Sequence, residues 1–315
     1  MSALRHIDVH HHILPDFYLA EARAAGLGTY AETPWPDWSP DRMLAMLDEQ
    51  RIAAAVVSMP PPGVCFVGTD RVPAFARPLP MTDVDATLDE LAYVLDVLGL
   101  DGVALYSNVE GRYLGHPDFE PVFAELDRRG ALAYLHPAVP PVDPAPEAAL
   151  PSWCGEFVFD TTRALADLVL SGRLARSPGL RLIVAHAGGT APYIINRLTN
   201  AWRELPGAAQ AAPEPPPAYL ARLYYDTASC GAGHGLRLLR DLVGTERILV
   251  GSDFPFVPAH SVATLERNLA DPRFLGVTAD ALRANALRLL PRFAGADVAR
   301  LNRSTSTFPD PVLAT

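Results

Sequence analysis

The sequence predicts an α/β protein folded as a (β/α)8 TIM barrel. Eight short apolar runs, many of them rich in β-branched residues, recur along the 315 residues. Amphipathic segments separate most of these runs, and strand followed by helix, repeated, is typical of a parallel sheet. Eight such units over roughly 250 residues favour closure into a barrel, whose active site lies at the C-terminal ends of the strands. An open, doubly wound sheet is the alternative.

The expected strands follow one another along most of the chain. In order, they occupy residues 6–10, 53–59, 73–80, 102–107, 131–136, 181–186, 222–227 and 247–253. Helices are expected at residues 39–50, 83–99, 117–130 and 160–176, where apolar residues recur at helical spacing. Ser39 and Asp160 are predicted to be N-cap residues of two of these helices.

One unit of the expected barrel is irregular. Residues 60–72, between the second and third strands, contain no helical period. Either a barrel helix is absent there, or the strand at 73–80 is misassigned. The chain is otherwise expected to form one domain, a barrel with C-terminal helices over residues 1–302, followed by a flexible tail at 303–315.

Composition and charge exclude several classes of protein. The chain has 26 basic and 36 acidic residues, and a net charge of −10 argues against a nucleic-acid partner, which needs a basic face. No apolar run approaches the roughly 18 residues of a membrane span, and the first residues have no signal-peptide pattern. The three cysteines form no C-x-x-C pair, which suits a reducing compartment. A cytoplasmic protein without a membrane partner is expected.

The ends of four expected strands carry residue types that bind metals. Three histidines, residues 10–12, end the first strand, His136 ends the fifth, His186 the sixth and Asp253 the eighth. Imidazole and carboxylate ligands suit zinc or a related divalent ion. Each histidine alone is explained as well by an ordinary core or surface position. Four coincidences at strand ends favour a shared site.

Strand alternation divides the three consecutive histidines. Alternate side chains point to opposite faces of a strand, so His10 and His12 share a face. Ile7 and Val9 are apolar and suit packing against the helix layer. The even positions are therefore expected to face the barrel interior, with His11 facing away, and a metal would use only two of the three histidines.

Four motifs, IDVHHHILP, LHP, LIVAHAGG and GSDFPF, occur in this order, and as a set they resemble the amidohydrolase superfamily. Within it, the chain resembles the branch of aminocarboxymuconate semialdehyde decarboxylase and the hydroxybenzoate decarboxylases over nearly its whole length. The segments FDTTRALADLVLSG, GRYLG and YYDTAS are most similar to the 6-methylsalicylate decarboxylase subgroup. The resemblance implies a barrel of the metal-dependent hydrolase type.

The resemblance also implies roles for individual residues. It makes His10, His12, His136 and Asp253 the ligands of one divalent metal ion, usually zinc and sometimes manganese. It makes His186 the acid/base of the reaction. The glycines that follow His186 are expected to let the backbone turn close to the metal.

Other residues are expected to bind the substrate. Arg197 resembles an arginine that binds a substrate carboxylate, often across a homodimer, although a solvated arginine on a helix face is the alternative. Trp153 and Phe159 are candidates for an aromatic pocket together with Trp38 and Phe157, and core packing explains each of them as well. The arginine that the semialdehyde decarboxylase supplies before its second strand has no counterpart here, which argues against a dicarboxylate substrate.

The resemblance, together with the residues at the strand ends, implies a metal-dependent, nonoxidative decarboxylase of a small hydroxylated aromatic acid such as 6-methylsalicylate, without an organic cofactor. The metal would orient the carboxylate, and Asp253 or His186 would deliver a proton to the ring carbon. Hydrolysis of an amide or lactone by the same residues is the nearest alternative. A catalytically silent binding protein is another, although retention of the whole residue set argues against it. Cys230 follows the seventh strand, and without a partner base it is not expected to be a nucleophile.

Overall fold

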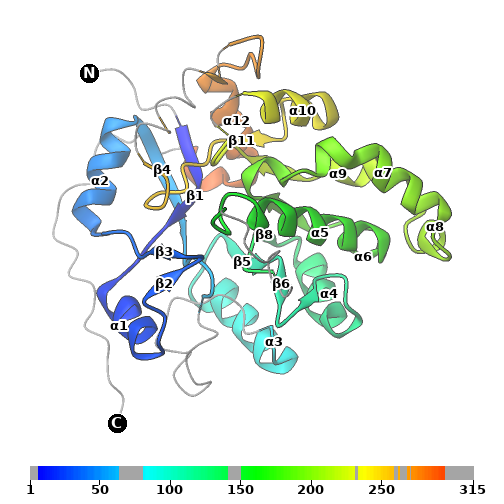
Figure 1. The fold of residues 1–315 in the computed structure, drawn as a ribbon, viewed down its shortest axis with the longest axis horizontal. Helices are drawn as coiled ribbons and strands as arrows, with labels where there is room; N and C mark the ends of the chain where they lie inside the picture. Colours follow the sequence, from blue (N-terminus) through cyan, green and yellow to red (C-terminus); the bar gives the residue numbers. More distant parts are fainter. Residues whose placement is uncertain are drawn as a thin grey trace.

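Within the described residues, seven parallel strands form the centre of the molecule and helices surround them (Figure 1). The computed structural model describes residues 6–63, 81–140, 150–230, 233–258, 262, 268–269 and 271–294. The parallel strands are β1 (His6–His12), β4 (Ile52–Ser58), β5 (Gly102–Tyr106), β8 (Leu132–His136), β9 (Arg181–Val184), β10 (Tyr224–Asp226) and β11 (Ile248–Leu249).

The strands follow the order expected of a parallel barrel. Five of them form a sheet in the order β11, β10, β9, β8, β5, and β1 pairs with β4. Asp8 of β1 forms a parallel bridge with Val250, next to β11, and the Val9 amide donates to the Val250 carbonyl at 2.9 Å. The combined order is therefore β4, β1, β11, β10, β9, β8, β5, as in a barrel read from one strand to the next.

Each of these seven strands overlaps a predicted one. The remaining prediction, a strand at 73–80, and most of the irregular unit before it lie outside the described residues. Two short antiparallel hairpins interrupt the connections. They pair β2 (Thr29–Tyr30) with β3 (Thr33–Pro34), and β6 (Asn108–Val109) with β7 (Arg112–Tyr113).

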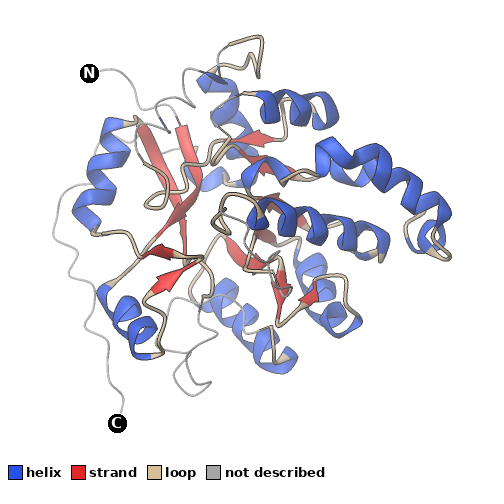
Figure 2. Cartoon of the chain, in the orientation of Figure 1, coloured by secondary structure: helices blue, strands red, loops and turns tan. Residues whose placement is uncertain are grey.

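The helices lie outside the parallel strands (Figure 2). They are α1 (Asp16–Ala24), α2 (Pro40–Glu49), α3 (Val84–Ala92), α4 (Glu120–Arg129), α5 (Glu156–Leu170), α6 (Arg173–Arg176), α7 (Ala191–Glu204), α8 (Ala208–Ala211), α9 (Pro216–Leu220), α10 (His234–Val243) and α12 (Ala279–Leu289). A π-helical turn, Tyr93–Val97, extends α3. No helix in the described ranges is long and apolar enough to cross a membrane.

One predicted N-cap is confirmed and the other is wrong. The Ser39 hydroxyl accepts a hydrogen bond from the Arg42 amide at 3.2 Å and caps α2. Helix α5 begins at Glu156, so Asp160 lies inside it rather than at its start. The Asp160 side chain is completely buried and accepts hydrogen bonds from residues 107, 108 and 113 on neighbouring segments. The carboxylate that was predicted to cap its own helix therefore forms tertiary hydrogen bonds instead.

Alternate residues of β8 show how the core is divided. Ala133 and Leu135 pack in a cluster that includes Leu165 of α5, on the helix side of the strand. Leu132 packs instead with residues of other strands, among them Ile183 of β9. His136 follows Leu132 at an even spacing, so its side chain lies on the inner side, at the C-terminal end of β8.

Strand β1 does not keep strict alternation. Its pairing with β4 shifts register between Asp8 and His11, which indicates a bulge. Ile7 and Val9 lie in the same cluster as Leu132 and Ile183, so they face other strands as well as α12. The prediction placed these two residues against the helix layer and the even positions toward the interior, but both residues also face the other strands. Because of the bulge, His10 lies on the inner side as well.

Candidate metal centre

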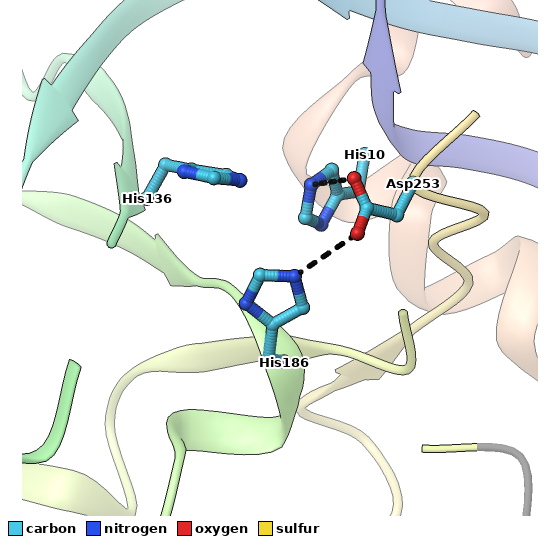
Figure 3. A group of neighbouring side chains, drawn as sticks. All are labelled: His10, His136, His186 and Asp253. Atoms are coloured by element: carbon cyan, nitrogen blue, oxygen red, sulfur yellow. Dashed lines mark hydrogen bonds and ion pairs between the residues drawn. The ribbon is translucent and has the colours of Figure 1, made fainter. Parts of the chain in front are cut away.

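Four strand ends bring a group of histidines and one carboxylate together. Nitrogen or oxygen atoms of His10, His136, His186 and Asp253 all lie within 4.8 Å of one another, and all four residues are buried. Figure 3 shows the rings of the two later histidines and the carboxylate turned toward a common point beside His10. Because the carboxyl ends of parallel strands meet at one end of a barrel, residues 243 positions apart become neighbours.

His12 joins the same group from the end of β1. Its Nε2 lies 3.1 Å from His10 Nε2 and 3.4 Å from Asp253 Oδ1. Asp253 Oδ1 also lies 3.3 Å from His10 Nε2, and Asp253 Oδ2 lies 3.3 Å from His186 Nε2. The carboxylate therefore contacts three of the four histidines.

His11 is turned away from this group, as predicted. Its Nδ1 lies 2.9 Å from Asp8 Oδ2, and its ring stacks on Phe254 with the centroids 4.9 Å apart. Asp8 also accepts hydrogen bonds from the amide and hydroxyl of Ser252, the residue before Asp253. The outward histidine thus helps to hold the segment that carries the carboxylate.

Burial and charge prepare these side chains for a cation. Burial lowers the pKa of His12, and burial with the neighbouring histidines lowers the pKa of His136 well below its usual value. Burial raises the pKa of Asp253, but the attraction of His10 and hydrogen bonds from the histidines outweigh it and hold the carboxyl ionised. Burial lowers the pKa of His10, whereas Asp226 and Asp253 raise it to about 10. A divalent ion would displace that proton.

The donor set fits a divalent metal ion. Neutral imidazoles with one carboxylate are the ligands of many zinc sites. His136 Nε2 is buried and has no hydrogen-bond partner among the described residues, although it faces the group. A buried, unpaired ring nitrogen costs free energy unless something binds it, and a metal ion would satisfy it.

The backbone at two of these positions is in the left-handed region. His186 has φ = 53° and Asp253 has φ = 58°, which is unfavourable for residues other than glycine. Gly188 and Gly189 follow with φ values of 75° and 64°, and a Cβ on Gly189 would collide with the Val158 carbonyl. The AHAGGT segment therefore turns sharply beside the group, as the sequence predicts.

The sequence analysis missed Asp226, at the end of β10. This carboxylate is fully buried, and its Oδ2 lies 3.0 Å from His10 Nδ1. Its sequence signal is the same one that singled out Asp253, an aspartate directly after an apolar strand. The motif YYDTAS contains this aspartate, but the sequence does not show what its carboxylate contacts.

A cavity of about 920 Å³ adjoins the group. Its lining includes His12, His136, His186 and Asp253. Most of the remaining wall is apolar or aromatic, from residues Tyr30, Ala31, Pro60, Pro61, Trp153, Phe157, Val158, Phe256, Val257, Pro258 and Val262. The volume is within the range typical of small-molecule sites.

Only one of the three predicted substrate-binding residues lines the cavity. Trp153 lines the cavity, whereas Phe159 is 47% exposed and lies outside the lining. Arg197 is exposed on α7 and does not line the cavity of its own chain. Cys230 does line it, and burial raises the pKa of its thiol to about 12, so the thiol stays protonated. That agrees with the expectation that Cys230 is not a nucleophile.

Comparisons with known proteins agree with this architecture. The family model described as amidohydrolase matches residues 7–292. The 6-methylsalicylic acid decarboxylase of Aspergillus aculeatus is 31% identical over 92% of this chain and 97% of its own length. A solved structure of amidohydrolase II has a TM-score of 0.83 and 25% identity, covering 91% of this chain and 99% of the other.

A second solved structure shares the fold and binds a metal. The 5-carboxyvanillate decarboxylase of Novosphingobium aromaticivorans, complexed with manganese and a nitrobenzoic acid, has a TM-score of 0.75 and 20% identity, covering 92% of this chain and 96% of its own. These likenesses confirm the predicted barrel class. Because the family model matches residues 7–292, the chain belongs to the amidohydrolase family.

Proposed function

We propose that the chain is a metal-dependent, nonoxidative decarboxylase of a small hydroxylated aromatic acid such as 6-methylsalicylate. The observation that carries the proposal is the buried group of histidines and one carboxylate in the wall of a largely apolar cavity. The likeness to a 6-methylsalicylic acid decarboxylase over 92% of the chain supports the same class of reaction.

Three histidines have the hydrogen bonding expected of metal ligands. A histidine that binds a metal through one ring nitrogen usually donates a hydrogen bond from the N–H of the other to a protein acceptor, which fixes the tautomer. Nδ1 of His10 lies 3.0 Å from Asp226 Oδ2, Nδ1 of His12 lies 3.3 Å from the Ser58 hydroxyl, and Nδ1 of His136 lies 2.8 Å from the carbonyl of the next residue. Each Nε2 is thereby left for the metal. These contacts support these three histidines, with Asp253, as the ligands.

His186 differs from the three proposed ligands. Its Nδ1 is buried and has no partner among the described residues, so no contact there fixes its tautomer. Its Nε2 lies 3.3 Å from Asp253 Oδ2. A histidine that can exchange a proton with a neighbouring carboxylate suits acid/base work, so we assign His186 that role.

The chemistry then divides between the ion and the chain. The ion would act as a Lewis acid that orients the acid and its neighbouring hydroxyl. The pair of His186 and Asp253 holds the proton that goes to the ring carbon bearing the carboxylate. Once that carbon is protonated, the carbon–carboxyl bond breaks, carbon dioxide leaves, and the bonding electrons restore the aromatic ring. The largely apolar wall suits an aromatic ring.

The cavity favours an acid with a single carboxylate. No arginine occurs among the described residues that line it, and the basic residues of this chain are all arginines. The described lining of this chain therefore offers a second carboxylate no counter-charge, and burial without one is costly. Trp153 and Phe157 offer aromatic surface to a ring and its apolar substituent.

We propose zinc as the ion, because three imidazoles and a carboxylate suit it, and manganese is the alternative. Metal analysis of protein purified without chelators should find about one zinc per chain. A metal-free, fully active protein would refute the proposal.

The free Cys154 and Cys230 support the predicted reducing, cytoplasmic location.

Carbon dioxide release from a panel of salicylates, compared with hydrolysis of lactones and amides, tests the reaction. Release from 6-methylsalicylate and related monocarboxylates is expected, with much slower turnover of dicarboxylates. Opening of a lactone, with no release from any acid, would favour hydrolysis instead.

We also propose a homodimer in which Arg197 serves the neighbouring subunit. Its exposure on α7, away from the cavity of its own chain, supports this arrangement. Mixing inactive Arg197→Ala and His186→Gln proteins under conditions of subunit exchange should restore activity, because one mixed site then has both residues. No recovery despite demonstrated exchange would refute the role across the interface.

A further inference from the structure

Asp226 holds four hydrogen-bond donors and has no exposed surface. Its Oδ2 accepts from His10 Nδ1 at 3.0 Å and from the Tyr134 hydroxyl at 2.6 Å. Its Oδ1 accepts from the backbone amides of His186 at 3.0 Å and Ala228 at 2.9 Å. Two donors on each oxygen make this carboxylate a fixed point between strands β8, β9, β10 and β1.

We propose that Asp226 is the positioning residue of the centre, acting on both the metal and the proton-transfer side. Through Oδ2 it holds His10 with a proton on Nδ1, so that Nε2, which faces Asp253, is the nitrogen that gives up its proton to an ion. Through Oδ1 it holds the backbone of His186. This inference rests on the proposed metal site, and it concerns what keeps that site assembled.

The His10 contact controls which nitrogen can bind a metal. A carboxylate only accepts hydrogen bonds, so the nitrogen that faces it must carry the proton. In the Asp226→Asn variant, an amide group facing His10 would place two donors together unless the ring moved its proton to Nε2. That tautomer cannot ligate through Nε2. Turning the amide the other way would set its NH2 against the amides of His186 and Ala228.

The His186 contact concerns the backbone. With φ = 53° the residue is in a region that persists only where surrounding contacts hold it. The hydrogen bond from its amide to Asp226 Oδ1 is such a contact, between residues 40 positions apart. Without it, relaxation of the backbone would turn the His186 ring away from Asp253.

The test compares Asp226→Asn with two other variants. Zn²⁺ affinity is measured by competition with a chromophoric chelator, so the readout does not depend on activity. We expect the dissociation constant of Asp226→Asn to rise about 10–100-fold. With saturating Zn²⁺, kcat should still be about 100-fold low because His186 is displaced. Tyr134→Phe, which leaves His10 its acceptor, and Asp167→Asn, a half-buried carboxylate that bonds the Gly115 amide, should keep wild-type affinity.

A second measurement covers the case in which Asp226→Asn does not fold. Wild-type protein labelled with 15N-histidine and loaded with 113Cd²⁺ should show cadmium coupling to Nε2 of His10 and a directly bonded proton on its Nδ1. Coupling through Nδ1, or an Nδ1 without a proton, would overturn the inference.

The outcomes separate this inference from the proposed function. Unchanged Zn²⁺ affinity in folded Asp226→Asn overturns the inference and leaves the decarboxylase proposal standing. So does an equal loss in Tyr134→Phe, which would assign the positioning to the phenol. Wild-type protein that binds Zn²⁺ but decarboxylates no acid refutes the proposed reaction, while weakened binding in Asp226→Asn still supports the inference. Failure of the wild type to bind Zn²⁺ refutes the centre itself before any variant is made.

Discussion

Replacing Asp160 by alanine is expected to destabilise the folded protein by about 3–5 kcal/mol. The carboxylate is completely buried and accepts from the Ser107 hydroxyl, from Asn108 Nδ2 at 2.9 Å and from the Tyr113 hydroxyl at 2.6 Å. Each hydrogen bond to a charged acceptor contributes about 1.5–3 kcal/mol. Removal of the charge also removes its own desolvation cost, so the net loss is smaller than the sum of three bonds.

The magnitude distinguishes a buried acceptor from a helix cap. The loss of an N-cap side chain costs about 1 kcal/mol, whereas three donors without their acceptor cost several times more. Urea denaturation, followed by circular dichroism on metal-free protein, measures the difference. Tyr113→Phe is the matched control, since it removes one of the three donors and should cost about 1.5 kcal/mol. A loss for Asp160→Ala no larger than that of the control would refute the reasoning.

Three further results are expected at the centre and its cavity. His11→Gln should keep nearly the wild-type metal content, and His12→Gln should lose most of it; equal metal content by elemental analysis would contradict the division of the histidines. His186→Gln should abolish carbon dioxide release with the metal retained, and loss of the metal instead would make His186 a ligand. At pH 8, iodoacetamide should modify the exposed Cys154 and spare Cys230 in folded protein, because burial raises the pKa of Cys230 to about 12 and little thiolate is present. Rapid modification of both thiols, mapped by mass spectrometry, would show that Cys230 is not shielded.

The strand ends were predictable from the sequence because a parallel barrel collects them. Each of His136, His186 and Asp253 ends an apolar run, and the fold, once recognised, brings the carboxyl ends of such runs together whatever the loops between them do. No knowledge of loop conformation was needed. The same physical reason explains why nearly all of the candidate centre could be named in advance.

The division of the histidine run was predicted correctly from a register that the strand does not keep. Regular alternation from Ile7 to His12 would put Val9 and His10 on opposite sides, whereas the bulge after Asp8 shifts the phase. One extra residue puts Val9 and His10 on the same side, and alternation resumes with His11 outward and His12 inward. A bulge is set by pairing with β4, so the residues of β1 alone do not reveal it.

The contacts of the two buried aspartates could not be predicted from neighbouring residues. Rules for helix caps consider only the next few positions, and Asp160 satisfied them. Its partners lie 47 to 53 positions away, and Asp226 reaches His10 across 216 positions. Contacts between residues so far apart in the sequence form only in the assembled barrel. A sequence pattern therefore identifies each carboxylate but not the residues that it contacts.

The kind of hydrogen-bond partner explains why two similar aspartates are suited to different roles. Asp226 ends β10 and Asp253 follows the neighbouring β11, and both lie beside His10. The four donors on Asp226 leave its oxygens no free direction for a cation. The Asp253 oxygens contact ring nitrogens of His10, His12 and His186 and, at 3.4 Å, the Ser229 hydroxyl. A metal ion or a transferred proton would engage those ring nitrogens. The carboxylate whose partners a metal ion can engage is the one suited to ligation, and the one held by a phenol and two backbone amides is suited to holding its neighbours still.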